Sequence, residues 1–248
     1  MAEEIVEQGY RELADTILEH NPGVDLGRVR AAFELADRAH SGQKRKAGTP
    51  YVTHCVAAAQ ICAEMGLDED SIVAALLHDC IEDTAITHED IARQFGAEVA
   101  DIVEGVTKLT RVQFTSREDE QMENLRKMLM AMAKDIRVIL IKIADRLHNM
   151  RTMEYMVAQK QLEKSLETME IYAPIAHRLG LQKVKWELED LSLKYLDPDG
   201  YREIITYLDS KADVLNKFMS DVEKKITDRL TEYNIHATVQ SRIKHTYS

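Results

Sequence analysis

Apolar side chains recur three and four residues apart along most of this sequence, which is the spacing of one face of an α-helix. In the stretch 29–40, for example, Val29, Ala32, Phe33 and Ala36 share such a face. Turn-forming residues are scarce, with ten glycines and four prolines in 248 residues, about half the usual share. Aromatic residues are few as well, with one Trp, nine Tyr and four Phe. This combination disfavours a β-sandwich or barrel and predicts an all-α fold of long helices.

Local signals set the expected ends of these helices. Thr53 is a candidate helix cap, and Thr87 has an acidic residue three positions later, the spacing of a capping box. The polar segment 109–119 is expected to be a loop, and DPDG at 197–200 a turn. Alternating β-branched residues predict one strand at 235–239. The expected helices span about 29–40, 53–65, 71–83, 87–95, 97–108, 118–133, 135–150, 160–179, 186–196 and 201–233.

Acidic residues outnumber basic ones, 43 against 32, which gives a formal net charge of −11. Nucleic-acid binding requires a basic face that displaces counterions from phosphates, so this balance argues against it. The N-terminus lacks the apolar centre of a signal peptide, and the most apolar runs, 71–77 and 138–144, are too short to cross a bilayer. Three cysteines without a pairing pattern favour reduced thiols. We therefore expect a cytoplasmic protein with no membrane partner and no direct nucleic-acid partner.

An ionisable patch follows the most apolar helix. His78, Asp79, Glu82 and Asp83 form two pairs one helical turn apart, directly after the apolar run 72–77. Three carboxylates in an apolar environment repel one another and lose hydration. Because a bound cation relieves both costs, the pattern predicts a metal site. The alternative interpretation is a solvated acidic helix end.

Two other helices supply matching groups. His54 lies at the start of one predicted helix, and Asp145 follows the apolar run 138–144. Taken alone, each is more often a structural polar residue than a ligand. Together with His78 and Asp79 they offer two imidazoles and two carboxylates. Such a mixed set, with room for water, suits Mn²⁺ or, less specifically, Fe²⁺, Mg²⁺ or Zn²⁺.

A short basic segment precedes His54. Lys44, Arg45 and Lys46 lie between glycines in an otherwise acidic protein. Such a cluster is ordinarily a solvated loop, but this one lies close in sequence to a candidate ligand. Cations beside a metal are suited to holding a polyphosphate. The segment therefore predicts a highly anionic substrate.

Four longer strings carry a family resemblance. In order, they are GQKRKAGTPYVTH, LLHDCIEDT, KIADRLHNMRT and YAPIAHRLGL. The order of His54, His78-Asp79 and Asp145 resembles the HD-domain metal phosphohydrolases. The full strings resemble the N-terminal hydrolase domain of the Rel/SpoT family, bifunctional synthetase–hydrolases of the alarmone (p)ppGpp in the bacterial stringent response. The similarity covers about residues 5–200.

The resemblance implies an all-α HD domain that binds one Mn²⁺ per chain through His54, His78, Asp79 and Asp145. It implies hydrolysis of the 3′-pyrophosphate of (p)ppGpp, which gives GDP or GTP and pyrophosphate. The guanine nucleotide is then the expected partner. Glu82 and Asp83 correspond to the acidic pair that handles the attacking water in the family. Arg45 and Lys46 correspond to its nucleotide-contacting loop, and Asn149 and Thr152 correspond to its pocket wall.

The resemblance also divides the chain. Residues 1–196 are expected to form the hydrolase domain, 197–234 a helical connector, and 235–248 the start of a truncated synthetase domain. The parent protein is then expected to be a GTP pyrophosphokinase as well, an activity absent from this chain. Cys55 departs from the pattern, because the family usually has proline after the first metal-binding histidine. No ligand is lost by this difference.

Two alternatives stay open at the level of sequence. One is another HD-family phosphohydrolase that acts on different nucleotides; a two-metal version needs further converging histidines, and His148 is the best placed. The other is a regulatory domain that binds (p)ppGpp without cleaving it. The acidic pair Glu82 and Asp83 favours catalysis, because a pure binding site has no need of groups that activate water.

Overall fold

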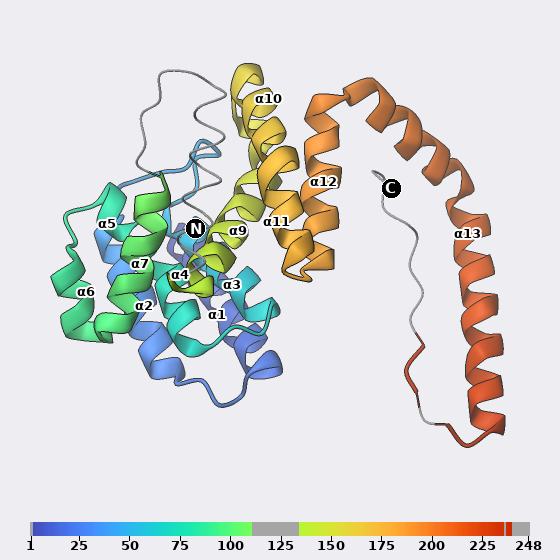
Figure 1. Cartoon of the computed structure of the whole chain (residues 1–248), viewed down its shortest axis with the longest axis horizontal. Coiled ribbons are helices and arrows are strands. Elements are labelled where there is room, and N and C mark those ends of the chain that lie inside the picture. Colours follow the sequence, from blue (N-terminus) through green and yellow to red (C-terminus); the bar gives the residue numbers. More distant parts are fainter. Residues whose placement is uncertain (1, 111–133, 236, 240–248) are drawn as a thin grey trace.

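The computed structural model describes residues 2–110, 134–235 and 237–239 of the chain. Every regular element in these residues is a helix, so the all-α prediction is confirmed (Figure 1). An isolated antiparallel bridge pairs Lys44 with Pro50. The helices are α1 (Ala2–His20), α2 (Leu26–Ala39), α3 (Val52–Glu64), α4 (Glu69–Leu77), α5 (Cys80–Asp83), α6 (His88–Phe95), α7 (Ala97–Thr110), α9 (Ile136–Arg151), the 3₁₀-helix η1 (Met153–Tyr155), α10 (Ala158–Glu167), the π-helix η2 (Thr168–Tyr172), α11 (Ala173–Arg178), α12 (Gln182–Leu196) and α13 (Pro198–Glu232).

Helix α4 lies at the centre of the core. Its residues 71–77 are buried, and it packs against α2, α3, α7 and α9. A helix that is apolar on every side is stable only when neighbours surround it, and burial of each large apolar side chain contributes about 1.5–3 kcal/mol. Because α4 is fixed on all sides, the two residues that follow it, His78 and Asp79, emerge at a defined place inside the protein.

Sequence signals at helix ends had mixed success. Thr87 begins α6 with a capping box in which both expected hydrogen bonds are present, so that prediction is confirmed. Gly66 ends α3 with a φ of 73°, a conformation that favours glycine. The prediction for Thr53 is wrong, because α3 begins one residue earlier, at Val52. The Thr53 hydroxyl instead donates to the carbonyl of Pro50 over 2.7 Å.

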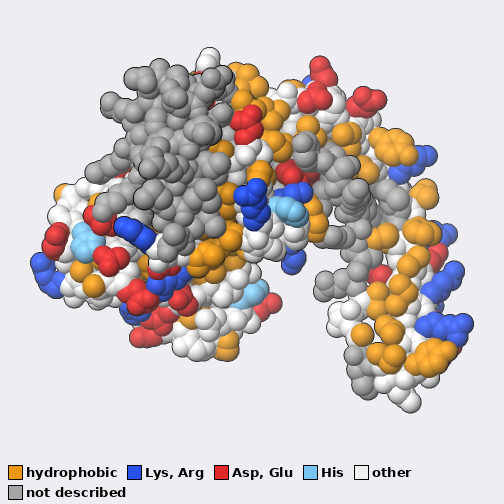
Figure 2. All heavy atoms as spheres, in the orientation of Figure 1, with side chains coloured by type: hydrophobic (Ala, Val, Ile, Leu, Met, Phe, Trp, Pro, Cys, Tyr) orange, Lys and Arg blue, Asp and Glu red, His pale blue; other side chains and the backbone are white. Residues whose placement is uncertain are grey.

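The C-terminal region differs from prediction in two places. The predicted turn at 197–200 is the first turn of α13, in which the Asp197 carboxylate accepts a hydrogen bond from the Gly200 amide at 3.0 Å. The predicted strand at 235–239 is absent from its described residues. Helix α13 contacts α12 and then extends away from the other helices (Figure 1). Apolar side chains are visible along it in Figure 2, and Ile204, Tyr207, Val214, Phe218 and Ile226 are exposed.

Three further predictions concern the segments 109–119, 118–133 and 160–179. The predicted loop 109–119 lies outside the described residues from 111 onward, and the predicted helix 118–133 lies outside them entirely. The single helix predicted over 160–179 is divided by the π-helical turn η2. Among the described helices, none combines the length and the apolar character that a membrane span requires.

Candidate metal centre

Four predicted ligands converge from three parts of the chain. His54 lies in the first turn of α3, Asp145 lies in α9, and His78 and Asp79 lie between α4 and α5. His54 Nε2 is 3.2 Å from Asp145 Oδ1 and 3.6 Å from Asp79 Oδ2. His78 Nε2 is 3.1 Å from Asp79 Oδ2 and 4.0 Å from Asp145 Oδ1. Ligand atoms of His54, His78 and Asp145 all lie within 4.8 Å of one another, so this group could hold a metal ion.

The chain turns at the two central residues instead of continuing as one helix. Helix α4 ends at Leu77 and α5 begins at Cys80, so the continuous helix predicted over 71–83 is wrong. The backbone departs little from a helix at this break. His78 and Asp79 both keep backbone angles close to the helical region, so the sequence gives only a weak signal for it. Asp79 Oδ2 lies 3.6 Å from His54 Nε2 of α3, and His78 Nε2 lies 4.0 Å from Asp145 Oδ1 of α9.

The charges around His78 favour a cation. Its Nδ1 lies 2.8 Å from the carbonyl of Ala75 and so donates to it, which leaves Nε2 facing the cluster. That Nε2 is buried and has no hydrogen-bond partner in the described structure. Burial lowers the pKa of His78, but Asp79 and Asp145 outweigh burial and raise it to about 9. This buried nitrogen lies 3.1 Å from Asp79 Oδ2 without hydrogen-bond geometry, in a field that stabilises positive charge, and such an arrangement fits a metal ion.

Neighbours on α9 hold Asp145 in place. Lys142 Nζ donates to Asp145 Oδ2 at 2.7 Å, and the Asn149 amide donates to Oδ1 at 2.5 Å. Burial opposes the charged form of Asp145, but Lys142 and the two histidines of the cluster keep its pKa well below the usual value. Asp145 is therefore an ionised carboxylate with a fixed orientation. Sequence reasoning missed Lys142, although it precedes Asp145 by three residues, a spacing that brings helical side chains together.

His148 contacts the metal cluster through His54. The two Nδ1 atoms are 2.7 Å apart, and the ring centroids are 4.8 Å apart. Burial, His54 and Arg45 lower the pKa of His148 to about 3, so this ring is neutral near pH 7. If His54 carries its proton on Nδ1, it donates to His148 and keeps the Nε2 lone pair for a metal. His148 thus contacts a predicted ligand and is absent from the groups of described residues that could hold a metal.

Cys55 offers another potential ligand atom. Its Sγ groups with His78 and Asp79 within the same distance limit. The thiol is buried, and burial raises its pKa well above the ordinary value. Without a metal ion the thiol therefore stays protonated near neutral pH, whereas a bound metal would deprotonate it.

The predicted substrate residues divide into two groups. Arg45 donates to the Asn149 side chain at 2.6 Å, so these two residues are joined to the Asp145 side of the cluster. Lys46 is exposed and makes no ion pair within the described part of the chain. The Thr152 hydroxyl bonds back to its own helix, 3.1 Å from the His148 carbonyl. Neither Lys46 nor Thr152 contacts a predicted ligand in the hydrogen bonds described.

The acidic pair lies on α5, beside the cluster. Asp83 is exposed and Glu82 is half-buried. Tyr51 joins Asp83 to the metal site, because its hydroxyl is 2.8 Å from Asp79 Oδ2 and 3.1 Å from Asp83 Oδ2. Sequence reasoning missed Tyr51. The available signal was its position three residues before His54 at the start of a helix.

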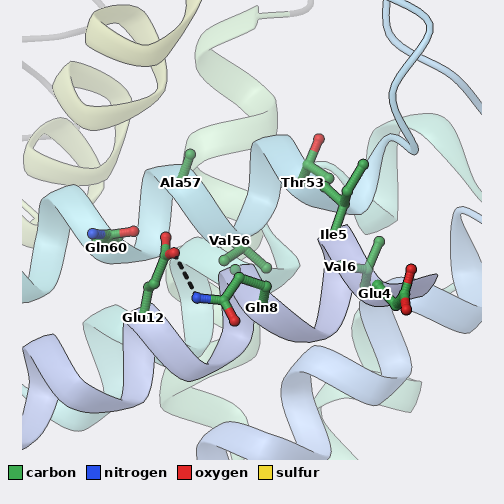
Figure 3. Close-up of a pocket in the computed structure, with 10 residues that line it drawn as sticks. Glu4, Ile5, Val6, Gln8, Glu12, Thr53, Val56, Ala57 and Gln60 are labelled. Carbon is green, nitrogen blue, oxygen red and sulfur yellow. Dashed lines mark hydrogen bonds between the residues drawn. The ribbon is translucent and has the colours of Figure 1, made fainter. Parts of the chain in front are cut away.

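A hollow lies elsewhere on the molecule. A cavity of about 620 Å³ lies between α1 and α3, and Figure 3 shows that no predicted metal ligand lines it. Gln8 donates to Glu12 across its edge at 2.9 Å. The convergence of buried ligand atoms, and not the size of a cavity, therefore identifies the candidate site.

Comparisons with known proteins identify a matching family and several similar proteins. The HD domain family matches residues 32–182. A probable GTP pyrophosphokinase of Mycobacterium leprae is 48% identical over 230 residues, which are 93% of this chain and 29% of that protein. The bifunctional (p)ppGpp synthase/hydrolase SpoT of Escherichia coli is 45% identical over 243 residues, 96% of this chain and 34% of that protein. This chain thus spans only about a third or less of the length of these relatives.

Two further matches carry hydrolase descriptions. A probable guanosine-3′,5′-bis(diphosphate) 3′-pyrophosphohydrolase of Synechocystis is 48% identical over 217 residues, 87% of this chain and 29% of that protein. A solved structure is described as "A metazoan ortholog of SpoT hydrolyzes ppGpp and plays a role in starvation responses". It is 27% identical, covers 68% of this chain and 91% of its own, and superimposes with a TM-score of 0.48.

Proposed function

This chain belongs to the HD domain family, and we propose that it hydrolyses the 3′-pyrophosphate of ppGpp and pppGpp, with GDP or GTP and pyrophosphate as products. The observation that carries the proposal is the buried group of His54, His78 and Asp145, with ligand atoms close enough to share one ion. Relatives named for this hydrolysis, with 45–48% identity, support the choice of substrate.

We propose Mn²⁺, one per chain, as the ion, with His54, His78, Asp79 and Asp145 as its ligands. Two imidazole nitrogens and two carboxylates form a donor set that suits this metal. The unpartnered His78 Nε2 and the ionised Asp145 support the assignment. When bound, such an ion supplies a Lewis acid for phosphoryl oxygens and lowers the pKa of a water molecule.

The residues of the basic loop bind the phosphates in this proposal. Arg45 and Lys46 neutralise charge on the 3′-pyrophosphate as the bond to the 3′-oxygen breaks. Asn149 accepts a hydrogen bond from Arg45 and donates one to Asp145, so it links the loop that binds substrate to a metal ligand. Thr152, the residue that follows α9, forms part of the pocket wall in this proposal.

The acidic residues of α5 handle the proton. Water attacks the phosphorus next to the 3′-oxygen, its hydroxyl joins the departing pyrophosphate, and its proton passes to Glu82 or Asp83. The nucleotide 3′-oxygen then takes up a proton to become a hydroxyl. Asp83 is suited to this role because it is exposed to solvent while remaining joined to Asp79 through Tyr51.

Pyrophosphate release from ppGpp tests the proposal directly. We expect turnover with Mn²⁺ and none after chelation. Glu82→Gln should retain Mn²⁺ and lose most turnover, about 100-fold or more for a group that transfers a proton. Glu89→Gln, which removes an exposed acid on α6, is the matched control and should behave as the parent. Parental turnover by Glu82→Gln would show that the role given to Glu82 is wrong.

The same assay separates the alternatives. Binding of ppGpp without turnover at any metal concentration indicates a regulatory domain. Turnover of other nucleotides in preference to ppGpp indicates a different HD-family phosphohydrolase. Two tightly held ions per chain, measured by elemental analysis, contradict the single-metal assignment.

We also propose the domain limits 1–196 for the hydrolase, 197–234 for a connector and 235–248 for the start of a synthetase domain. The end of α12 at Leu196 and the start of α13 at Pro198 support the first limit. Relatives named GTP pyrophosphokinase, which are much longer than this chain, support the synthetase of the parent. Limited proteolysis should cut α13 and leave an active fragment that ends near residue 196.

A cytoplasmic location fits the three buried free thiols.

A further inference from the structure

Tyr51 is held in one position by its surroundings. It is the last residue before α3, and its amide donates to the carbonyl of Gln43 at 3.1 Å. Its ring stacks on His40 with a centroid distance of 4.6 Å and an interplanar angle of 21°. The Arg45 guanidinium lies 5.6 Å from the ring centroid on the side of the basic loop. The phenol hydroxyl therefore projects from an immobilised ring.

That hydroxyl contacts two carboxylates with different proposed roles. It is 2.8 Å from Asp79 Oδ2, the same oxygen that lies 3.1 Å from His78 Nε2. It is also 3.1 Å from Asp83 Oδ2. A phenol has one proton, and near neutral pH an ordinary tyrosine keeps it. The shorter distance assigns the donated hydrogen bond to Asp79, with Asp83 on the other side of the same oxygen.

Among the described residues, the Asp79 carboxylate has side-chain hydrogen-bond or ion-pair contacts only with Tyr51, His54 and His78. Asp145, by comparison, is oriented by Lys142 and Asn149. Tyr51 thus orients the Asp79 carboxylate in the way that Lys142 and Asn149 orient the Asp145 carboxylate. Outer groups of this kind set the orientation of metal ligands, and their loss typically reduces metal affinity or activity by about 10–100-fold.

We propose that Tyr51 is a positioning residue that links Asp79, a proposed metal ligand, to Asp83, a proposed acceptor of the proton. Its hydroxyl donates to Asp79 and orients that carboxylate toward the cation. Its oxygen accepts a hydrogen bond from Asp83 once Asp83 has taken up the proton of the attacking water, while its ring supports Arg45 on the phosphate side. The inference rests on the proposed hydrolysis for the role of Asp83, but its part concerning Asp79 depends only on metal binding. It identifies a residue outside the ligand set and outside the predicted acidic pair.

Tyr51→Phe is the matched test, because it keeps the ring and removes one oxygen. Tyr10→Phe is the control: that hydroxyl donates to the Leu26 carbonyl at 3.3 Å, and the ring packs on Phe33 in the core of α1 and α2. We would measure the Mn²⁺ dissociation constant by titration calorimetry, kcat and KM for ppGpp at saturating Mn²⁺, and the thermal midpoint of each variant.

For Tyr51→Phe we expect Mn²⁺ affinity to fall about tenfold and kcat to fall about 10–100-fold, with KM within about twofold of the parent. Tyr10→Phe should leave all three unchanged. In Tyr51→Phe/Asp83→Asn, the loss of kcat should be smaller than the product of the two single losses, because the two residues act as a unit. If Tyr51→Phe loses stability, this cycle still measures the coupling at a temperature where every variant is folded.

Three results would overturn the inference: parental Mn²⁺ affinity and kcat in Tyr51→Phe, a rise in KM alone, or multiplicative losses in the double variant. If the parent binds Mn²⁺ but does not cleave ppGpp, the proposed function fails. The Mn²⁺ affinity of Tyr51→Phe then still decides whether Tyr51 positions Asp79.

Discussion

Acidic side chains lie at both ends of α4, but the residues that contact them differ between the two ends. At the N-terminal end the acids meet arginines, whose charge is permanent. Arg28 bonds Glu69 at 2.7 Å and Asp70 at 2.5 Å, and Arg137 bonds Asp135 and Glu98 at 2.6 Å each. At the C-terminal end, Asp79 faces His54 and His78, and Asp145 faces the same two histidines in addition to its ion pair with Lys142.

The comparison distinguishes a structural charge network from a site that can bind. Paired arginines and carboxylates satisfy each other and connect α2, α4, α7 and α9. Histidines beside carboxylates keep lone pairs that a cation can use. Similar acidic composition at the two ends of one helix therefore has different consequences, and the partner residue decides which.

The largest expected effect comes from removing one carboxylate at each end. Asp79→Ala should abolish Mn²⁺ binding and reduce ppGpp hydrolysis by more than about 100-fold, beyond the usual loss for an outer group. Asp70→Ala removes a partly exposed ion pair and should change stability by less than about 1 kcal/mol with parental activity. Elemental analysis and pyrophosphate release measure both. Equal losses of activity would erase the distinction between the two ends.

Truncation of a buried side chain in the middle of α4 creates a cavity, which should destabilise the whole helix and therefore both of its ends. Leu76 is fully buried, so Leu76→Ala should destabilise the protein by about 2–5 kcal/mol. Urea unfolding with and without Mn²⁺ measures the loss. Since Leu76 contacts neither substrate nor metal in the proposal, folded Leu76→Ala should still bind Mn²⁺. A loss of Mn²⁺ binding with unchanged stability would contradict the view of α4 as a scaffold.

The pH dependence of folding stability tests the charge network at the N-terminal end of α4. The hydrogen bonds from Arg137 hold the pKa of Asp135 below its ordinary value of 3.8. A lowered folded-state pKa adds stability that is complete above the ordinary pKa and is lost as pH falls below it. Arg137→Met should therefore lower the urea midpoint near pH 7 and reduce the further loss between about pH 5 and pH 3. Parallel stability curves for parent and variant would show that the pair contributes nothing to acid sensitivity.

Much of the fold and the candidate ligand set could be predicted from sequence. The helical period predicted an all-α protein, and the capping box at Thr87 was correct because it needs only neighbours within one turn. The resemblance to Rel/SpoT proteins, which rests on four strings, is confirmed by relatives with 45–48% identity. The roles of the individual site residues stay predictions, although the structure brings His54, His78, Asp79 and Asp145 together.

The errors have physical reasons that local patterns do not reveal. Thr53 can cap a helix, but the loop before it bonds its hydroxyl to Pro50 instead. The sequence DPDG suits a turn, yet aspartate before proline also suits a helix start, and α13 uses it that way. Tyr51 and Lys142 were missed because an orienting residue has no distinctive type of its own. Each is recognisable only from the ligand that it contacts.

The sequence by itself determined that the chain is helical, that α4 must be buried, and which residue types could serve a metal and a polyphosphate. These properties depend on side chains within about one helical turn. Only the tertiary structure decided that the chain turns at His78 and Asp79. It also paired His54 with His148 across 94 positions and Arg45 with Asn149 across 104. Such contacts depend on how α3, α4 and α9 pack around a shared core, and no local spacing encodes that geometry.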